Sequence, residues 1–458
     1  MMIHQKKHKR FITTKIIAYG FFLTILVGSL LLMLPICQSG AVEVSYIDAL
    51  FTATTSVCVT GLVTLPTYLA WSGFGQFIIL ILVEIGGLGI ITFTMLFLLI
   101  MGKKIGLRER MLIADAYNID TSRGLVILIK RIVLGTLAVQ GVGALLYMIV
   151  FVPEFGLKGI WHSIFLSASA FCNAGMDTMF ANSLEPYVFH PLVNFTSMAL
   201  IILGGIGYPV WWYFLERLRL WKNNNFRFIK AKSRMPLSVK IAVSVSLFLI
   251  FGGMLIILGL EYNNPDTLGK MNFWQKLQAA LFQSVTLRTA GFFTIPQENF
   301  RISTSIVHCI WMFIGGSPSG TAGGIKTTTI TVLMLTIISI LRGRDETESF
   351  HRSISGTIVR KAMSIFAVSF TVLLVSTIAL AAVQPDANFM DCLYETISAI
   401  STIGLTRAFT DDLNLAGKMI IIATMYIGRI GPISLSLFFN TGRNENLIRY
   451  PEENVSVG

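Results

Sequence analysis

Long apolar runs alternate with short polar segments along the whole chain, and the runs are long enough to cross a membrane. Crossing about 30 Å of hydrocarbon takes about 20 apolar residues in a helix. Eight runs reach that length, at residues 16–36, 74–101, 132–152, 191–215, 241–260, 303–341, 363–383 and 413–439. Four shorter helical segments lie between paired runs, at residues 46–56, 160–170, 274–286 and 390–400. These are too short to cross, so we expect them to be re-entrant and buried in protein or beside water.

Each short segment leads into a glycine-centred strip, and the strips recur at nearly constant spacing. Their central glycines, Gly61, Gly175, Gly291 and Gly404, are 114, 116 and 113 residues apart. A second glycine signature begins 24 to 29 residues after each of them. Two signatures in four registers indicate four copies of one unit. The sequence therefore predicts an all-α polytopic membrane protein with four repeats of a long helix, a short half-helix, a glycine strip and a second long helix. In pseudo-fourfold arrangement these repeats would surround one central pore.

The charge distribution supports a membrane protein and orients it. The chain is 54% hydrophobic and 13% charged, with a mean hydropathy of +0.70, which is typical of polytopic membrane proteins. Of the 36 Lys and Arg residues, 27 fall in the N-terminal tail, in residues 103–131, 217–240 and 342–361, and after the last run. These are alternate loops, so the positive-inside rule places both termini in the cytoplasm. This distribution accounts for the net charge of +12 without a nucleic-acid partner.

The basic segments also mark the joints between repeats. We expect a cytoplasmic basic tail at 1–15, repeats at 16–118, 119–236, 237–357 and 358–441, and a cytoplasmic C-terminal tail at 442–458. The opposite loops collect acids, among them Asp177, Glu298 and Asp411. Acids above the glycine strips would raise the local cation concentration; the alternative is that they belong to ordinary solvated loops.

The glycine strips suit the coordination of a monovalent cation by backbone oxygens. Glycine adopts positive φ without steric cost, so a short strip around it can turn successive carbonyls toward one axis. Four strips around a common axis would form rings of oxygens that replace the hydration shell of an ion. Such ligands do not depend on the side chains, which differ between the copies. The predicted carbonyl donors are Val59, Thr60, Gly61, Asn173, Ala174, Gly175, Thr289, Ala290, Gly291, Thr402, Ile403 and Gly404.

The last apolar run of the third repeat is interrupted by a polar stretch. Residues 315–324 contain five glycines and a proline, which cannot continue a helix. Non-helical backbone at membrane depth is tolerated where it lines a cavity, so we predict a gate here; the alternative is a kink in a packed helix. It is not a phosphate-binding loop, because no strand precedes it and no glycine directly precedes its lysine. The predicted gate residues are Gly315, Gly316, Ser317, Pro318, Ser319, Gly320, Thr321, Ala322, Gly323, Gly324, Lys326 and Arg429.

Charged residues inside apolar runs need a reason, because burying them in hydrocarbon costs free energy. Arg429 stands where the other three repeats have a glycine, and below the strips it would repel cations or pair with the gate. The alternative is a side chain that snorkels to the membrane edge. Glu84 is either a partner for a basic group or a pore residue. Arg288 and Arg407 are expected to be donors that hold the scaffold at the outer mouth.

Together these motifs resemble the Trk/Ktr/HKT superfamily of potassium transporters, most closely the ion-translocating membrane subunit of bacterial Ktr systems. The resemblance covers essentially the whole chain and rests on the four strips, the 315–324 stretch and Arg429, in that order. It implies a fourfold M1–pore helix–M2 architecture and potassium uptake, often stimulated by sodium, with 315–324 as a gating loop. Related plant proteins with serine in the first filter favour sodium, so Gly61 indicates potassium.

The resemblance also implies an assembly. Proteins of this type form a homodimer in the bacterial cell membrane, docked on a cytoplasmic ring of nucleotide-binding regulatory subunits that respond to ATP and ADP. For this chain K+ would be the transported ion and Na+ an activator, and nucleotide would act only through the partner subunit. Apart from these subunits and membrane lipid, no partner such as nucleic acid is expected.

Other protein classes fit the sequence less well. A secondary transporter would show inverted or paired halves and substrate-binding side chains near the membrane midplane, whereas these four repeats are parallel. A sodium- and potassium-permeable HKT/Trk-like secondary transporter is nevertheless the alternative kept open. An enzyme would need a Ser/His, paired-carboxylate or metal-ligand constellation, and the sequence contains none.

Overall fold

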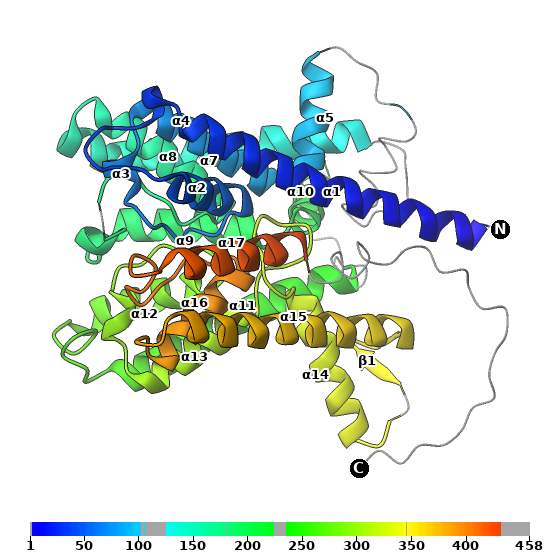
Figure 1. Cartoon of the computed structure of the whole chain (residues 1–458). Coiled ribbons are helices and arrows are strands. Elements are labelled where there is room, and N and C mark those ends of the chain that lie inside the picture. Colours follow the sequence, from blue (N-terminus) through cyan, green and yellow to red (C-terminus); the bar gives the residue numbers. More distant parts are fainter. Residues whose placement is uncertain are drawn as a thin grey trace.

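Helices make up nearly all the regular structure of this chain in the computed structural model, which describes residues 2–101, 106, 125–180, 182–223, 235–344 and 346–431 (Figure 1). Repeat one consists of α1 (Met2–Leu32), α2 (Tyr46–Cys58), the short α3 (Thr67–Ala70), α4 (Gly73–Leu88) and α5 (Ile90–Ile100). Repeat two consists of α7 (Leu125–Phe155), α8 (Lys158–Cys172), α9 (Pro191–Gly205) and α10 (Tyr208–Asn223).

The second half of the chain repeats this order with one change. Repeat three consists of α11 (Leu237–Glu261), α12 (Phe273–Thr286), α13 (Ile302–Phe313) and α14 (Thr327–Leu341). A hairpin of β1 (Thr347–Ser349) and β2 (Arg352–Ile354), paired antiparallel, leads from α14 into repeat four. That repeat consists of α15 (Gly356–Val383), α16 (Phe389–Ser401) and α17 (Leu415–Ile430). Three 3₁₀ turns complete the described elements: Pro35–Cys37, Glu185–Tyr187 and Gln297–Asn299.

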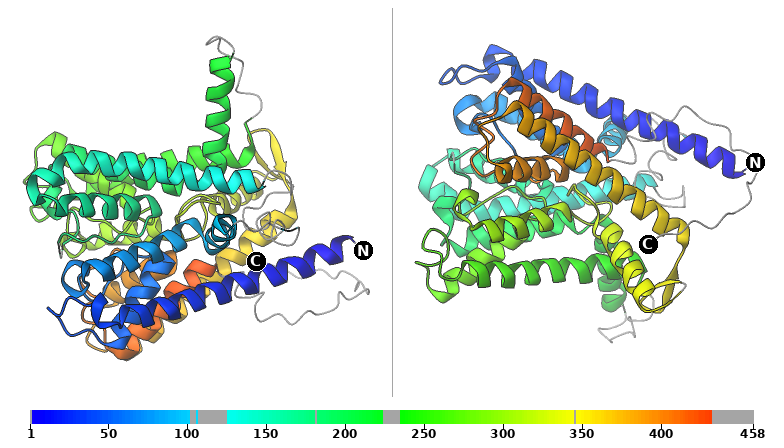
Figure 2. Two further views of the ribbon diagram at one scale, coloured as in Figure 1. Left: turned by 90° about the horizontal axis from the view of Figure 1, so that it is seen from above. Right: turned by 60° about the horizontal axis from the view of Figure 1, so that its bottom comes forward.

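The repeats close into a ring through one recurring helix contact. In each repeat the helix that follows the glycine strip packs on the half-helix of the next repeat: α4 on α8, α9 on α12, and α13 on α16. The last contact, α17 on α2, returns to the first repeat, and both views in Figure 2 show α1 and the last-repeat helices on the same flank of the bundle. The described helices therefore have the predicted pseudo-fourfold arrangement.

The second glycine signature provides close packing between helices. A Cβ built on Gly86, Gly204 or Gly428 would collide with a carbonyl oxygen near the end of the half-helix of the same repeat, that of Val57, Phe171 or Ile400. Only glycine allows the backbone to approach this closely. This contact fixes each second helix against its half-helix beside the glycine strip.

The second helices of repeats one and two are broken, contrary to the prediction of uninterrupted runs at 74–101 and 191–215. The bend is 108° between α4 and α5 and 100° between α9 and α10. Gly89 and Gly207 lie at these breaks with φ of +83° and +92°, and Gly431, which caps α17, has φ of +89°. A positive φ ends an α-helix at little cost in glycine. Helix α5 of repeat one and helix α14 of repeat three project sideways at the end of the bundle that carries the start of α1 (Figure 1).

Within the described residues, four helices are long and apolar enough to cross a bilayer: α1, α7, α11 and α15. The number rises to six if each bent pair is one span, and α13 and α14 are shorter apolar helices. Helix α1 already begins at Met2, so the expected tail at 1–15 is continuous with the first span; its Lys, Arg and Gln residues favour helix. The predicted joint near 118, the end of the last run and the tail at 442–458 lie outside the described residues, whereas the joint predicted at 236 directly precedes the start of α11 at Leu237.

Candidate functional site

The four glycine strips, residues 59–61, 173–175, 289–291 and 402–404, share an unusual backbone conformation. Their first residues, Val59, Asn173, Thr289 and Thr402, have φ between +50° and +66°. Their glycines have φ between +66° and +100°, and the residue between does not share the positive φ. A positive φ costs about 1–2 kcal/mol in a residue other than glycine. Three non-glycine types in this conformation, β-branched ones included, indicate that the surrounding structure imposes it.

Hydroxyl groups of the half-helices hold three of the strips. Thr55 and Ser398, each six residues before the strip glycine, accept hydrogen bonds from the backbone N–H of Gly61 (2.9 Å) and Gly404 (3.0 Å). Ser169, at the same register, accepts from the N–H of Met176 at 3.0 Å. Sequence reasoning missed these residues, although comparing the repeats at fixed distance from the glycine would have found them. Repeat three has Val285 at this position, and there Thr286 donates to the carbonyl of Phe292 instead.

The four strips meet around one centre. A Cβ built on Gly61 would lie 2.6 Å from the carbonyl oxygen of Ala174, one on Gly175 2.8 Å from that of Ala290, and one on Gly291 2.5 Å from that of Ile403. A Cβ on Gly404 would collide with the carbonyl oxygen of Thr60 in the first strip, which closes the cycle. Each glycine thus borders the next repeat so closely that a side chain has no space.

A cavity of about 230 Å³ opens directly on this ring and is lined by all four glycines. Asp177, Glu298 and Asp411 are also on its wall. Burial raises the pKa of the Asp177 carboxyl to about 6, although the N–H groups of Phe180 and Met179 donate to it. Another acid, Glu261 at the end of α11, is instead fully buried and accepts hydrogen bonds from Asn264, Thr267 and Thr304.

On the other side of the ring, the predicted gate stretch forms a loop that is bonded both within repeat three and to neighbouring repeats. The N–H groups of Ser317 and Thr321 donate to the carbonyls of Gly205 (3.0 Å) and Gly204 (3.1 Å) at the end of α9. The hydroxyl of Thr321 donates to the carbonyl of Phe171, two residues before strip two, at 3.1 Å. A Cβ on Gly323 would lie 3.0 Å from the carbonyl oxygen of Ser401, which directly precedes strip four. The loop therefore lies immediately beside the strips.

Arg429 joins this loop to two other repeats. From α17, its guanidinium donates to the carbonyl of Thr321 at 2.8 Å and to that of Gly86 in α4. Of the two functional arrangements expected, pairing with the loop is the one the structure contains. Lys326 donates to the carbonyl of Ala322 within the loop at 2.7 Å. Both cations line a cavity of about 380 Å³ on this side, together with residues 319, 320 and 322–325.

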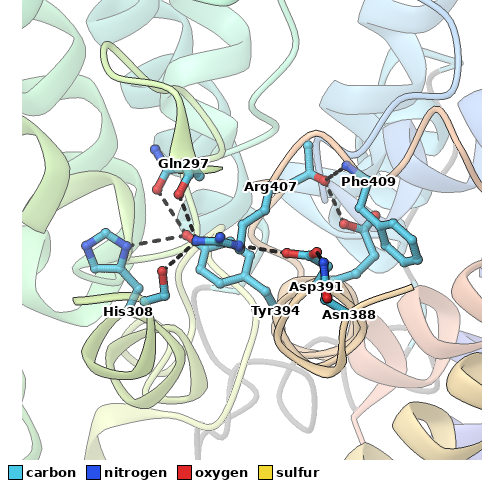
Figure 3. Close-up of polar contacts among 10 residues, drawn as sticks. Gln297, His308, Asn388, Asp391, Tyr394, Arg407 and Phe409 are labelled. Carbon is cyan, nitrogen blue, oxygen red and sulfur yellow. Dashed lines mark hydrogen bonds and ion pairs between the residues drawn. The ribbon is translucent and has the colours of Figure 1, made fainter. Parts of the chain in front are cut away.

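Arg407 fills the predicted role of a scaffold donor. Its Nε is 2.8 Å from the carboxylate of Asp391 on α16, and its Nη1 donates to the hydroxyl of Ser305 (2.7 Å) and the carbonyl of Gln297 (3.1 Å) (Figure 3). Tyr394 extends the network by donating to the side chain of Gln297 at 3.0 Å. These bonds tie the outer ends of repeats three and four together.

Two other intramembrane charges lie behind the strips. Arg288 is buried beside strip three and donates to the hydroxyl of Ser246 at 2.8 Å. Glu84 accepts a hydrogen bond of 2.6 Å from the amide of Gln140, so of the two alternatives for this residue the structure contains no pairing with a basic group among the described residues. Glu84 and Gln140 line a separate, mostly apolar cavity of about 420 Å³ between α4 and α7.

This arrangement defines a class: a multi-pass helical membrane protein in which four parallel repeats surround a central pathway. The family model described as TrkH, cation transport protein, matches residues 6–447. The chain therefore belongs to the TrkH family of potassium uptake transporters, whose members are ion transporters and not enzymes.

Several relatives align along nearly the entire chain. The Ktr system potassium uptake protein B of Bacillus subtilis (strain 168) is 40% identical over 453 residues, which are 99% of this chain and 98% of that protein. The potassium/sodium uptake protein NtpJ of Enterococcus hirae is 38% identical, with full coverage of both chains. The crystal structure of the potassium transporter TrkH from Vibrio parahaemolyticus matches with a TM-score of 0.72 and 16% identity, over 93% of this chain and 84% of the other. That last match establishes a shared fold.

Proposed function

We propose that this chain takes up potassium across the cell membrane of a bacterium through a pore whose selectivity filter is the ring of four glycine strips. The observation that carries the proposal is the cyclic approach of Gly61, Gly175, Gly291 and Gly404, each bordering the carbonyl that precedes the next glycine. The ion would be held by the carbonyl oxygens of residues 59–61, 173–175, 289–291 and 402–404. Rings of such oxygens replace the hydration shell of a monovalent cation. The names of two relatives, a potassium and a potassium/sodium uptake protein, are consistent with this.

The loop at 315–324, with Lys326 and Arg429, is the proposed gate. Its place immediately inside the strips supports this, and so do its bonds to Gly204, Gly205 and Phe171 in repeat two. Arg429 would hold the loop beneath the strips by its bond to Thr321 and would also oppose cations in the inner cavity by its charge. Displacing the loop would then join the inner cavity to the ring.

The assembly in the cell follows from the same relationship. The printed name of a relative, protein B of a Ktr system, implies a partner component, and we propose that this chain forms a homodimer on a cytoplasmic ring of nucleotide-binding regulatory subunits. Both termini would face that ring, in keeping with the basic alternate loops. Nucleotide would act through the ring alone, and sodium would stimulate potassium uptake.

A second candidate is a sodium- and potassium-permeable transporter of the HKT/Trk type. The relative named a potassium/sodium uptake protein, 38% identical over the full chain, is the observation that favours it. The two functions differ in whether sodium competes with potassium for the filter or only stimulates its uptake.

Replacing Gly61 by Ser tests the filter. A Cβ at this position, where φ is +100°, would lie 2.6 Å from the carbonyl of Ala174 and would distort one quarter of the ring. We expect about a tenfold loss of preference for potassium over sodium, measured as competition for rubidium uptake in bacteria that lack their own potassium uptake systems. Unchanged selectivity at normal membrane abundance would overturn the filter assignment. In the unmodified protein, sodium that inhibits rubidium uptake competitively would favour the second candidate.

A further inference from the structure

Two positions at fixed distances from the strip glycine, one before it and one after it, can be compared in all four repeats. The residue thirteen before the glycine is at the start of the half-helix, and the residue three after it follows the strip toward the outer cavity. These pairs are Asp48 and Thr64, His162 and Thr178, Gln278 and Thr294, and Asp391 and Arg407. In three repeats the two side chains are joined directly, and we name these three pairs the outer latches.

The latch of repeat one is centred on a carboxylate. Thr64 donates to Asp48 Oδ1 at 2.9 Å, and Ser45 donates to Oδ2 at 2.6 Å. Lys418 from α17 forms an ion pair with Oδ1 at 2.8 Å. These three partners outweigh the effect of burial and lower the pKa of Asp48. The bond to Lys418 also joins this latch to the second helix of repeat four.

The other two latches use different chemistry for the same connection. His162 Nδ1 and Thr178 Oγ1 share a hydrogen bond of 2.7 Å in repeat two. In repeat four, Arg407 forms the ion pair of 2.8 Å with Asp391. Because the residue types change while the connection persists, the connection itself is the common feature.

Repeat three lacks the latch. The hydroxyl of Thr294 is buried without a hydrogen-bond partner in the structure, and Gln278 donates to the carbonyl of Val188 at 3.2 Å. The segment after strip three is instead bonded to repeat two: Phe293 accepts from the N–H of Leu184 at 3.0 Å and donates to the hydroxyl of Ser183 at 3.3 Å. Repeat three therefore offers an internal comparison, with the same residue type as repeats one and two but no latch.

We propose that the outer latches are positioning residues that fix the extracellular end of the filter and thereby set its preference for potassium over sodium. The proposal rests on the proposed function of the strips. In each latch, the residue three positions after the last predicted carbonyl donor is bonded to the start of the half-helix. This bond anchors the carbonyl donor to the half-helix. A site that distinguishes ions by the positions of its oxygen ligands needs those ligands held in place by the residues around them. Without a latch, the strip can relax toward the shorter distances that sodium favours.

The test uses one isosteric substitution at three equivalent positions. Thr64, Thr178 and Thr294 are all buried, and Val replaces the hydroxyl by a methyl group of similar size. We expect Thr64→Val and Thr178→Val to lower the potassium-over-sodium preference about fivefold, the effect of losing one buried hydrogen bond. The matched control Thr294→Val is expected to stay within about twofold of the unmodified protein. The readout is sodium inhibition of rubidium uptake, with the maximal uptake rate and membrane abundance measured in parallel.

The latch of repeat four is tested by Asp391→Asn, which removes the charge and keeps the shape; the conservative Asp391→Glu should restore most of the selectivity. Equal effects at Thr64, Thr178 and Thr294 would overturn the proposal, as would a fall in abundance and uptake rate with unchanged selectivity. Gly61→Ser distinguishes a failure of the latch proposal from a failure of the proposed function. If it changes selectivity and the latch variants do not, the latches fail and the filter stands; if it changes nothing, the proposed function itself fails.

Discussion

The glycine strips and the loop at 315–324 are both irregular, glycine-rich backbone at the centre of the protein, yet they are held in different ways. Hydroxyls of the preceding half-helix bond the strips of repeats one, two and four within their own repeat. Within repeat three the loop is bonded from Gly315 to Ile325, from Gly316 to Gly323 and from Lys326 to Ala322, and Thr327 of α14 donates to Gly316. Further bonds of the loop reach into other repeats, to Gly204, Gly205, Tyr208, Phe171 and Arg429.

This difference separates a fixed element from a displaceable one. Moving a strip would break bonds to its half-helix and disturb the neighbouring strip, because each glycine contacts the carbonyl of the next repeat. Moving the loop would break a few hydrogen bonds, each with a net value of about 1 kcal/mol, or about 1.5–3 kcal/mol for those from Arg429. The strips are therefore suited to a permanent binding site, and the loop is suited to a part that moves.

Adding a side chain to the ring is the most severe test of the contrast between fixed strips and a displaceable loop. Gly404→Ala would place a Cβ against the carbonyl of Thr60 and 2.7 Å from the Cα of Gly61, at a φ of +94°. We expect uptake to fall at least a hundredfold, because two strips must separate and the four oxygens of a ring no longer converge. Rubidium uptake per unit of protein in the membrane measures this.

The control for Gly404→Ala is Gly141→Ala, a glycine inside α7 with nothing within 4 Å of an added Cβ. Its uptake should equal that of the unmodified protein, since alanine favours helix over glycine by about 1 kcal/mol. Near-normal uptake by Gly404→Ala would mean that the ring is not the ion pathway.

The sequence predicted the strips because their information is local and repeated. Four glycines at nearly equal intervals, each preceded by a short helix, were enough to infer a common backbone conformation and the convergence of the strips. It also indicated the loop, because five glycines and a proline cannot remain helical. The role of Arg407 as a scaffold donor was predicted correctly, although its partners Asp391 and Ser305 were not.

Two features could not be predicted, for physical reasons. Gly89 and Gly207 are each the last of three glycines within four residues of an apolar run. Each glycine is compatible with a continuous helix at a cost of about 1 kcal/mol, so the glycines alone do not predict a bend. Packing against other repeats decides the φ of Gly89 and Gly207. The partner of Glu84 was also beyond reach, because Gln140 is 56 residues away and nothing local joins the two.

A smaller effect is expected when the loop is loosened and the strips are left intact. Arg429→Ala removes the donors to Thr321 and Gly86, so the loop should leave its position more often. We expect potassium flux to rise about tenfold, with unchanged preference for potassium over sodium, in a rubidium flux assay on protein in vesicles. Deleting residues 316–323 should raise flux further.

Arg360→Ala is the matched control for Arg429, because Arg360 is an exposed arginine on α15 that does not line the inner cavity. It should leave flux unchanged. A flux that falls in Arg429→Ala, in protein that remains folded and present in the vesicles, would contradict the assignment of the loop as a gate, since loosening a barrier cannot slow the ion.

The smallest effect concerns the contrast in charge between the two sides of the ring. The outer cavity has Asp177, Glu298 and Asp411 on its wall, and the inner cavity has Lys326 and Arg429. Because burial raises the pKa of Asp177 to about 6, its carboxylate is charged above that pH and neutral below it. Outer negative charge, and with it the local potassium concentration, should therefore decrease as the pH falls through 6.

The KM for potassium should accordingly rise about two- to threefold between pH 7.5 and pH 5.5, with little change in maximal rate. Asp177→Asn should show the higher KM at both pH values and a reduced pH dependence. Asp386→Asn, which neutralises an exposed acid that does not line the cavity, should behave like the unmodified protein. A pH dependence of KM that persists in full without Asp177 would assign it to other groups, and Asp411 would be examined next, because burial and the neighbouring Asp412 raise its pKa as well.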